Sequence, residues 1–209
     1  GKLQLELLEL VKNGEFQLLL CILMIDEYDV HWSDLSWVSE KKQRFAPPAE
    51  AGVEALDDDL EKLVIDGKID GFLAPSTKDG KKPSGEQKLR RLFPDTKAEE
   101  RGYFTRTGIF PLNHAVVIHD ETLAKYPNCP KPMFDAYCAS KKQFYAEGGN
   151  LNPWGDDDDG HDFIQFGLTD KNREIVATLM RYLHEQKFIS QIPDIDALFV
   201  DGAGDWIDA

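Results

Sequence analysis

Apolar residues recur along this chain with two different spacings, and together these predict a mixture of helices and strands. A spacing of three to four residues, typical of amphipathic or buried helices, is found at 15–27, 57–64, 86–92, 96–106, 120–126, 133–145 and 170–186. Short apolar runs or alternating patterns, typical of strands, are found at 2–11, 35–38, 69–73 and 115–118. Helices that alternate with strands predict a fold of the α/β class.

Capping residues and polar stretches mark the ends of these elements. Asp95 is placed to cap the fourth helix, and Thr169 or Asp170 is placed to cap the last helix, which ends near Gln186. Three polar stretches are predicted loops: 41–57, 77–85 and 148–161. The last of them contains four consecutive aspartates without the alternating spacing of a calcium loop, so we interpret it as a solvated linker. The tail from Ile195 either packs or frays.

The composition and charge exclude several classes of partner. With 42% hydrophobic and 11% aromatic residues in 209, the chain resembles a soluble globular protein. Its formal net charge of −14 repels phosphate backbones and anionic lipid, so we expect neither nucleic acid nor a membrane surface as a partner. An anionic substrate is repelled at long range too. A carboxylate ligand therefore needs a local cation in a sheltered site.

The cysteines, the lengths of apolar runs and the absence of common catalytic motifs exclude further classes of protein. Cys21, Cys129 and Cys138 have no metal-ligand spacing, and their odd number does not suggest a disulfide framework, which favours a reducing cytoplasm. The longest apolar run, 18–25, is far shorter than the roughly 20 residues that span a bilayer. The chain begins at Gly1 without a methionine or a basic signal segment, so we expect a removed segment or an internal start. The absence of CxxC, HExxH, GxSxG, Walker and GxGxxG patterns argues against metal hydrolases, nucleophile-elbow esterases and nucleotide enzymes.

The chemically densest stretch is YFTRTGIFPLNHAVVIH, residues 103–119. It joins a predicted helix that ends at Arg106 to the predicted buried strand 115–118, with a proline between them. A junction of this kind can hold side chains rigidly while their tips stay open to a cleft. Arginine binds a carboxylate through two parallel hydrogen bonds, and histidine suits proton transfer near neutral pH. Arg106 and His114 are therefore the leading candidates for chemistry.

Each candidate also has a structural interpretation. His114 would then be a hydrogen-bonded imidazole at the start of a strand. Arg106 would pair with Glu99, with Glu100 or with an aspartate of the acidic surface. A second histidine five residues after His114 would lie about 17 Å away along a strand, too far to share the chemistry of one small substrate. We interpret three histidines as surface or structural residues: His31, His119 and His184.

The segment TRTGIFPLNHAVVIHDETLAKYP, residues 105–127, resembles the C-terminal signature of the 4,5-dihydroxyphthalate decarboxylases and their relatives among substrate-binding proteins. The resemblance extends upstream through IDGFLAPS and RRLFPDTKAEERGYFTRTG and downstream through GHDFIQFGLTDKNREIVATLMRYLHEQKF, and it covers roughly 14–199. It implies a periplasmic-binding-protein type 2 architecture, in which two α/β lobes hold the ligand between them. The family's N-terminal region is mostly missing here, so we expect one incomplete lobe, with either association into a homo-oligomer or poor stability as its consequence.

The resemblance divides the chain into a substrate lobe, 1–107, and a C-terminal segment, 108–209, that returns to the second lobe. It implies that His114 is the catalytic proton donor and that Arg106 anchors the substrate carboxylate. Further substrate contacts are expected beside these two, beyond the predicted strand 69–73 and at the N-terminus of the first predicted helix. These contact residues are Tyr103, Thr107, Gly108, Asn113, Ala74, Pro75, Ser76, Phe16 and Gln17. Pro75 and Ser76 have the alternative roles of ending a strand and capping a turn.

The activity implied by the resemblance is non-oxidative decarboxylation of a hydroxylated aromatic acid such as 4,5-dihydroxyphthalate, a carboxy-lyase reaction of aromatic-compound degradation. A ring hydroxyl supplies electrons, the carbon that bears the carboxylate is protonated, and CO2 leaves. The partner is thus a small aromatic carboxylate. No cofactor and no metal ligands are implied, although the need for a divalent metal is left open. The alternative is a non-catalytic substrate-binding protein of an ABC-type transporter for a small aromatic carboxylate.

Overall fold

The computed structural model describes residues 28–41, 47–74, 76–110, 114–155 and 162–208. The chain divides into two compact units whose segments alternate along the sequence. The first unit takes Gly1–Val11, Lys97–Thr178 and Pro193–Ala209, and the second takes Lys12–Thr96 and Leu179–Ile192. The predicted division into lobes at 107 stays a prediction.

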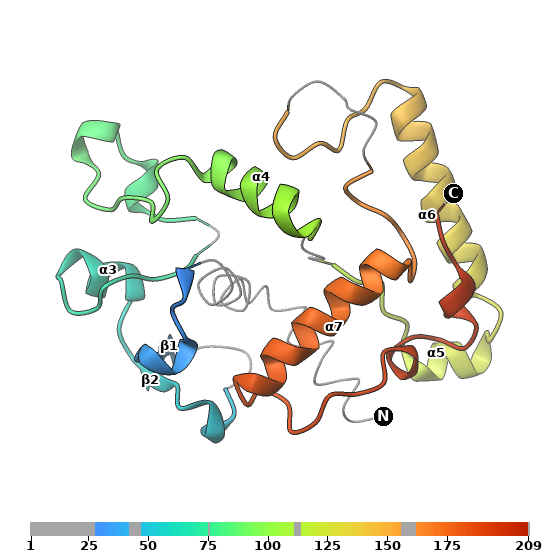
Figure 1. Cartoon of the computed structure of the whole chain (residues 1–209), viewed down its shortest axis with the longest axis horizontal. Helices are drawn as coiled ribbons and strands as arrows, with labels where there is room; N and C mark the ends of the chain where they lie inside the picture. The colour runs from blue at the N-terminus through green and yellow to red at the C-terminus, as the bar shows by residue number, and fades with distance from the viewer. Residues whose placement is uncertain (1–27, 42–46, 75, 111–113, 156–161, 209) are drawn as a thin grey trace. The chain divides into compact units, whose positions relative to one another are not determined.

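Five of the predicted helices are confirmed in the described residues, and one of them, 57–64, corresponds to α3 (Leu60–Ile65). The other four are longer or lie further along the chain. They are α4 (Thr96–Thr107), α5 (Asp120–Lys125), α6 (Pro130–Ala146) and α7 (Asp170–Glu185), as Figure 1 shows. Thr169 caps α7, because its Oγ1 accepts a hydrogen bond from the backbone N–H of Asn172 at 3.1 Å. Helix α6 starts about one turn earlier than predicted, with Pro130 near its first position, where the missing N–H of proline is tolerated. No helix in the described part of the chain is both long and apolar enough to cross a membrane.

The second unit contains a short parallel sheet. Strands β1 (Val38–Glu40) and β2 (Glu54–Leu56) pair in parallel with Ser39 opposite Ala55. Helix α3 (Leu60–Ile65) follows, and the carboxylate of Asp59 caps its N-terminus. The described residues thus combine helices with a small parallel sheet, in agreement with the α/β class. The two-lobed binding-protein architecture stays a prediction.

Several short 3-10 turns connect these elements. They are η1 (Trp32–Asp34), η2 (Ala49–Ala51), η3 (Asp79–Lys81), η4 (Ser84–Glu86), η5 (Asp196–Leu198) and η6 (Ala203–Asp205).

The strand predictions in the second unit are largely wrong. The pattern placed a strand at 35–38, but β1 begins only at Val38, and the predicted loop 41–57 contains β2. Residues 69–73, also predicted as a strand, form none. The middle of that run is Asp-Gly, and strands disfavour both residues, so its apolar side chains do not make a continuous extended segment.

The loop between α3 and α4 is built around the carboxylate of Asp79, whose side chain is about 1% exposed. One oxygen accepts a hydrogen bond from the Lys82 ammonium at 2.8 Å, and the other accepts from the backbone N–H groups of Lys88 and Leu89 at 2.7 and 2.8 Å. Because the N–H groups of Lys88 and Leu89 donate to this carboxylate, they are not available for the backbone hydrogen bonds of a helix. The helix predicted at 86–92 is absent. A buried acceptor elsewhere in the sequence therefore overrides the local helical pattern.

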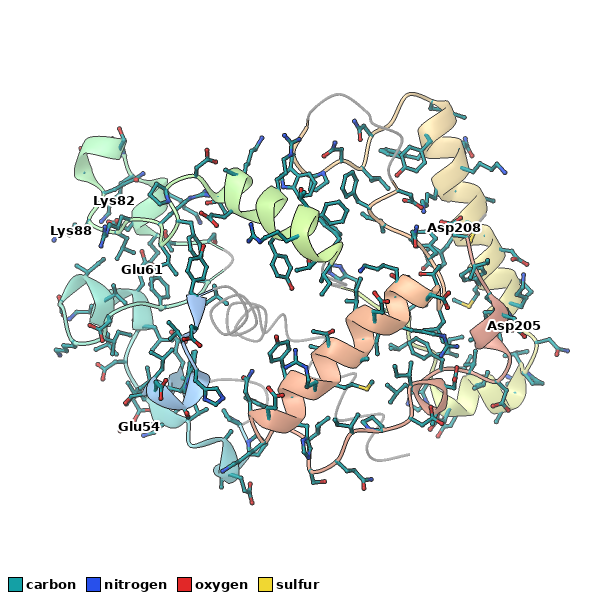
Figure 2. The ribbon with its side chains drawn as sticks, in the orientation of Figure 1. Glu54, Glu61, Lys82, Lys88, Asp205 and Asp208 are labelled. Atoms are coloured by element: carbon teal, nitrogen blue, oxygen red, sulfur yellow. The ribbon has the colours of Figure 1, made fainter. Side chains whose placement is uncertain are left out.

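Glu61 of α3 also holds this loop. Its two carboxylate oxygens accept hydrogen bonds from the backbone N–H groups of Lys78, at 2.9 Å, and Asp79, at 2.6 Å. The Lys78 ammonium lies 2.5 Å from a carboxylate oxygen of Asp59. Figure 2 shows Glu61 near Lys82 on this part of the second unit. The stretch 77–85, predicted as an exposed loop, is thus fixed by one buried and two flanking carboxylates.

The pKa of the Asp79 carboxyl is held below its ordinary value, chiefly by the hydrogen bond from Lys82 and then by those from the backbone of Leu89 and Lys88. A carboxylate with a lowered folded-state pKa stabilises the fold above its unfolded pKa of about 3.9, and this stabilisation is lost as the pH falls through the lower folded value. We expect Asp79→Asn to lower stability at pH 7 and to flatten the loss of stability below pH 4. Urea unfolding at pH 7 and pH 3 measures both effects. The exposed Asp70→Asn is the control, and equal pH dependence of the two variants would contradict the assignment.

An aromatic cluster forms part of the core of the first unit. The rings of Phe104, Phe110, Trp154 and Phe163 contact one another with centroids 5.1 to 6.4 Å apart. The Lys97 ammonium donates to the backbone carbonyl of Trp154 at 3.1 Å. The C-terminal half of α4 therefore packs, through Phe104, against the segments that contain Trp154 and Phe163.

The C-terminal segment of the first unit packs and does not fray. Gly167 forms an antiparallel bridge with Ile207, and the backbone N–H of Asp208 donates to the carbonyl of Phe166 at 3.2 Å. Gly167 has a φ of +90°, and a Cβ there would lie 1.9 Å from the carbonyl oxygen of Trp206. Only glycine permits this close approach.

A nearly buried ammonium joins the C-terminal segment to α6. The Lys141 side chain is 8% exposed, and its Nζ lies 2.5 Å from a carboxylate oxygen of Asp162 and 2.6 Å from the carbonyl oxygen of Ile164. It also donates to the carboxylate of Asp208, which Figure 2 labels near the C-terminus. The same ammonium lies over the ring of Phe166, 4.8 Å from the centroid. Three chain segments therefore meet at one cation.

Candidate functional site

The C-terminal end of α4 carries four of the predicted site residues. Thr107 closes the last turn, because its Oγ1 donates to the carbonyl of Tyr103 at 2.9 Å and accepts from the backbone N–H of Ile109 at 3.0 Å. Gly108 follows with a φ of +63°, and its N–H donates to the carbonyl of Phe104 at 2.6 Å. This left-handed glycine is a common way to end a helix, and it ends α4 where the sequence predicted.

Arg106 lies in the last turn of the same helix and is exposed. Its guanidinium folds back along α4, since a Cβ added to Gly102 would lie 3.0 Å from Nη1. A cation at this end of a helix is favoured by the helix dipole. Tyr103, one turn earlier, is buried, with 7% of its surface exposed. The structure thus gathers Tyr103, Arg106, Thr107 and Gly108 at one helix end, while their contacts with a substrate stay predictions.

Sequence reasoning missed a second cation at this helix end, Lys171 of α7. Its Nζ donates to the carbonyl of Thr107 at 3.0 Å and also lies 3.1 Å from a carboxylate oxygen of Glu174. A Cβ on Gly108 would lie 3.0 Å from this Nζ. One weak signal was available in the sequence. A lysine in the first turn of a helix opposes the helix dipole, which suggests that it serves something other than its own helix.

His114 directly follows residues 111–113 in the chain and begins an exposed segment. Among the described residues no hydrogen bond holds its imidazole, so the interpretation as a hydrogen-bonded structural histidine gains no support. The predicted buried strand at 115–118 is wrong, because the segment is not a strand and Val116 is 61% exposed. A run of four apolar residues needs a neighbouring strand to pair with, and none is present in the described residues. The segment ends at His119, which precedes α5 as its N-cap residue.

The roles of the other predicted contact residues stay predictions. Ala74 and Ser76 belong to the second unit, where both are exposed in a segment without regular secondary structure. Four further residues lie outside the described part of the chain: Phe16, Gln17, Pro75 and Asn113.

Metal ligands do not gather in the parts of the chain that the structure covers. No group of three or more histidine, cysteine, aspartate or glutamate side chains there is arranged to hold a metal ion. Cys129 and Cys138 are free thiols. Burial, followed by the negative charge of Asp208, raises the pKa of the Cys138 thiol, so this side chain is a poor nucleophile. At the end of α4 the described side chains offer two cations, Arg106 and Lys171, and the hydroxyl group of Thr107.

Comparison with known proteins gives one distant similarity. No family model matches the chain, and no solved structure matches it. The chain is 26% identical over 130 residues to 4,5-dihydroxyphthalate decarboxylase from Comamonas testosteroni. The similarity covers 56% of this chain but only 38% of that protein, so the chain spans well under half of its relative's length. At this level of identity the comparison suggests that family, and the chain is distantly similar to a 4,5-dihydroxyphthalate decarboxylase.

Proposed function

We propose that this protein is a carboxy-lyase that catalyses the non-oxidative decarboxylation of a hydroxylated aromatic acid such as 4,5-dihydroxyphthalate. The observation that carries the proposal is the similarity to a 4,5-dihydroxyphthalate decarboxylase. The cations at the end of α4 support it, because an anionic substrate needs them in a chain with a net charge of −14. The proposal includes a two-lobed binding-protein fold and a place in the cytoplasm beside other enzymes of aromatic-compound degradation.

In the proposed reaction the ring itself supplies the electrons. A hydroxyl group on the ring pushes electron density to the carbon that bears the carboxylate, and His114 delivers a proton to that carbon. The resulting dearomatised intermediate resembles a β-keto acid. Its carbon–carboxylate bond then breaks, CO2 leaves, the bonding electrons restore the aromatic ring, and the imidazole regains a proton from water.

Arg106 has the role of holding the substrate carboxylate. A guanidinium can bind a carboxylate with two parallel hydrogen bonds and so fix the plane of the ring relative to the proton donor. Tyr103, Thr107 and Gly108 form the helix end that carries Arg106.

The direct test is the reaction of the purified protein with 4,5-dihydroxyphthalate. We expect release of CO2 and formation of 3,4-dihydroxybenzoate in equal amounts, followed by the change in substrate absorbance and by gas analysis. Calorimetric binding is measured in parallel, with and without a divalent metal. Binding of the acid without CO2 release, even with the metal present, would contradict the enzyme proposal and favour a substrate-binding protein.

A further inference from the structure

The loop between α3 and α4 carries a charge opposite to that of the chain as a whole. Its residues 78–91 contain six lysine and arginine side chains against two carboxylates, Asp79 and Glu86, which gives a net charge of +4 in a chain of −14. The six cationic residues are all exposed: Lys78, Lys81, Lys82, Lys88, Arg90 and Arg91. A local surface of this charge attracts anionic groups at close range, even where the whole molecule repels them at a distance.

Half of these cations take part in no ion pair within the described part of the chain. Lys78 and Lys82 pair with nearby aspartates, whereas no ion pair there uses Lys81, Lys88 or Arg90. These three side chains can therefore bind a carboxylate from outside without first breaking an ion pair.

The backbone that carries these cations is held in place from within the second unit. The buried carboxylate of Asp79 accepts from the backbone N–H groups of Lys88 and Leu89, and Glu61 accepts from those of 78 and 79. Figure 2 shows Lys82 and Lys88 on this loop. A partner therefore meets a surface that loses little backbone entropy when it binds.

The C-terminal segment, 193–209, carries the complementary charge. It contains five aspartates and no lysine or arginine, and two of these aspartates already pair with cations of α7 and α6. The bridge between Gly167 and Ile207 holds the segment against the first unit. Three exposed aspartates of the segment lie in no ion pair among the described residues: Asp194, Asp201 and Asp205.

We propose that the loop 78–91 of one copy of this protein binds the acidic C-terminal segment, 193–209, of a second copy. Exposed cations without acidic partners on one surface match exposed aspartates without cationic partners on the other. Because the two surfaces are different parts of the chain, the contact is heterologous, and it continues to further copies unless the ring closes. The proposal is independent of the proposed activity.

Salt should affect this association in two directions. Two molecules of net charge −14 repel each other at long range, and at about 0.1 M salt the Debye length of about 10 Å screens this repulsion while leaving touching side chains paired. At about 1 M salt the Debye length falls to about 3 Å, and the exposed pairs are screened as well. Association is therefore expected to be strongest at the intermediate concentration.

The test is a charge exchange followed by sedimentation velocity of the full chain over a series of protein concentrations. Reversing two cations of the loop, Lys81→Glu with Arg90→Glu, should weaken self-association at least about tenfold, because attraction becomes repulsion at the contact. Reversing two aspartates of the C-terminal segment, Asp201→Lys with Asp205→Lys, should weaken it similarly. The chain that carries all four changes should associate again, because the signs are exchanged and stay complementary.

The matched control is Lys125→Glu with Lys142→Glu, two exposed lysines of α5 and α6. It changes the net charge as much as the loop variant does, so it separates the position of the charge from its total. The two reversed pairs lie in different units, and thermal unfolding shows whether each variant is folded, so a folding defect in one leaves the other as a test.

Several results would overturn the inference. They are a monomer at every concentration in about 0.1 M salt, an equal loss of association in the control, and a fourfold variant that stays monomeric. A protein that remains monomeric but binds a labelled oligonucleotide through the loop would overturn it too, since the partner would then be a nucleic acid.

Discussion

Replacing His114 by alanine is expected to reduce CO2 release by about 10²–10⁴-fold while leaving affinity for the aromatic acid within a few-fold of the unmodified protein. Only the proposed decarboxylation needs a proton donor, and it needs one in the transition state, whereas binding uses ground-state contacts. The imidazole is exposed and has no hydrogen bond among the described residues, so its loss should not disturb the fold. Turnover is measured from substrate absorbance, binding from calorimetry, and folding from the thermal unfolding temperature.

Two further variants separate the loss of the proton donor from the loss of substrate binding and from the loss of any histidine. Arg106→Ala should lose both binding and turnover, because the carboxylate is no longer held. His119→Ala removes a histidine that precedes α5 and should change neither quantity. Parallel losses of turnover in the His114 and His119 variants, or a His114 variant that decarboxylates at the normal rate, would exclude His114 as the proton donor.

Lys141→Met is expected to destabilise the first unit by about 3 kcal/mol, because it leaves carboxylates of a buried ion-pair network without their cation. The side chain of Asp208 is only 12% exposed, so its carboxylate is destabilised most when the cation is removed. The side chain of Asp162 is 34% exposed, and water still solvates part of its carboxylate. The methionine side chain still fills the space over Phe166, so the loss measures charge and hydrogen bonding more than packing. Urea unfolding at pH 7 gives the difference. Lys142→Met, next in the chain and exposed, is the control.

The effect of Lys141 should also depend on pH in a defined direction. Burial lowers the pKa of Lys141, but hydrogen bonds to Asp162 and Asp208 outweigh it and raise the pKa above the ordinary 10.5. A raised folded-state pKa gives stability that is complete below the unfolded pKa and is lost as the pH rises through the folded value. The difference between the unmodified protein and Lys141→Met should therefore be constant from pH 6 to 9 and shrink above pH 10.5. A difference that grows with pH would contradict the assignment.

Helices α4 and α7 could be predicted from the sequence because their determinants are local. Thr169 supplies the cap of α7, and Gly108 supplies the left-handed residue that ends α4, each within a few positions of the hydrogen bonds that it affects. Strands depend on a partner elsewhere in the chain. The apolar run 115–118 has no such partner among the described residues, whereas β2, with an unremarkable pattern, has β1.

The candidate site was predictable in part for the same reason. Arg106, Thr107 and Gly108 are consecutive, so their meeting at a helix end follows from one local pattern. Lys171 reaches this end from another helix, and Asp79 organises its loop through backbone groups about ten residues further on. Neither contact leaves a periodic trace in the sequence. The pattern of hydrophobic residues does not reveal long-range polar contacts of this kind.

The alternation of the two units along the sequence bears on how the protein folds during synthesis. A ribosome releases the chain from its N-terminus, and domains made of one continuous segment can fold as they emerge. Here the second unit must wait for Leu179–Ile192, and the first must wait for Pro193–Ala209. Lys141 in particular is translated well before Asp208, its partner in the ion-pair network. Both units are therefore completed only after 179–209 has been translated, and until then apolar faces of the earlier segments stay exposed, where chaperones can bind them.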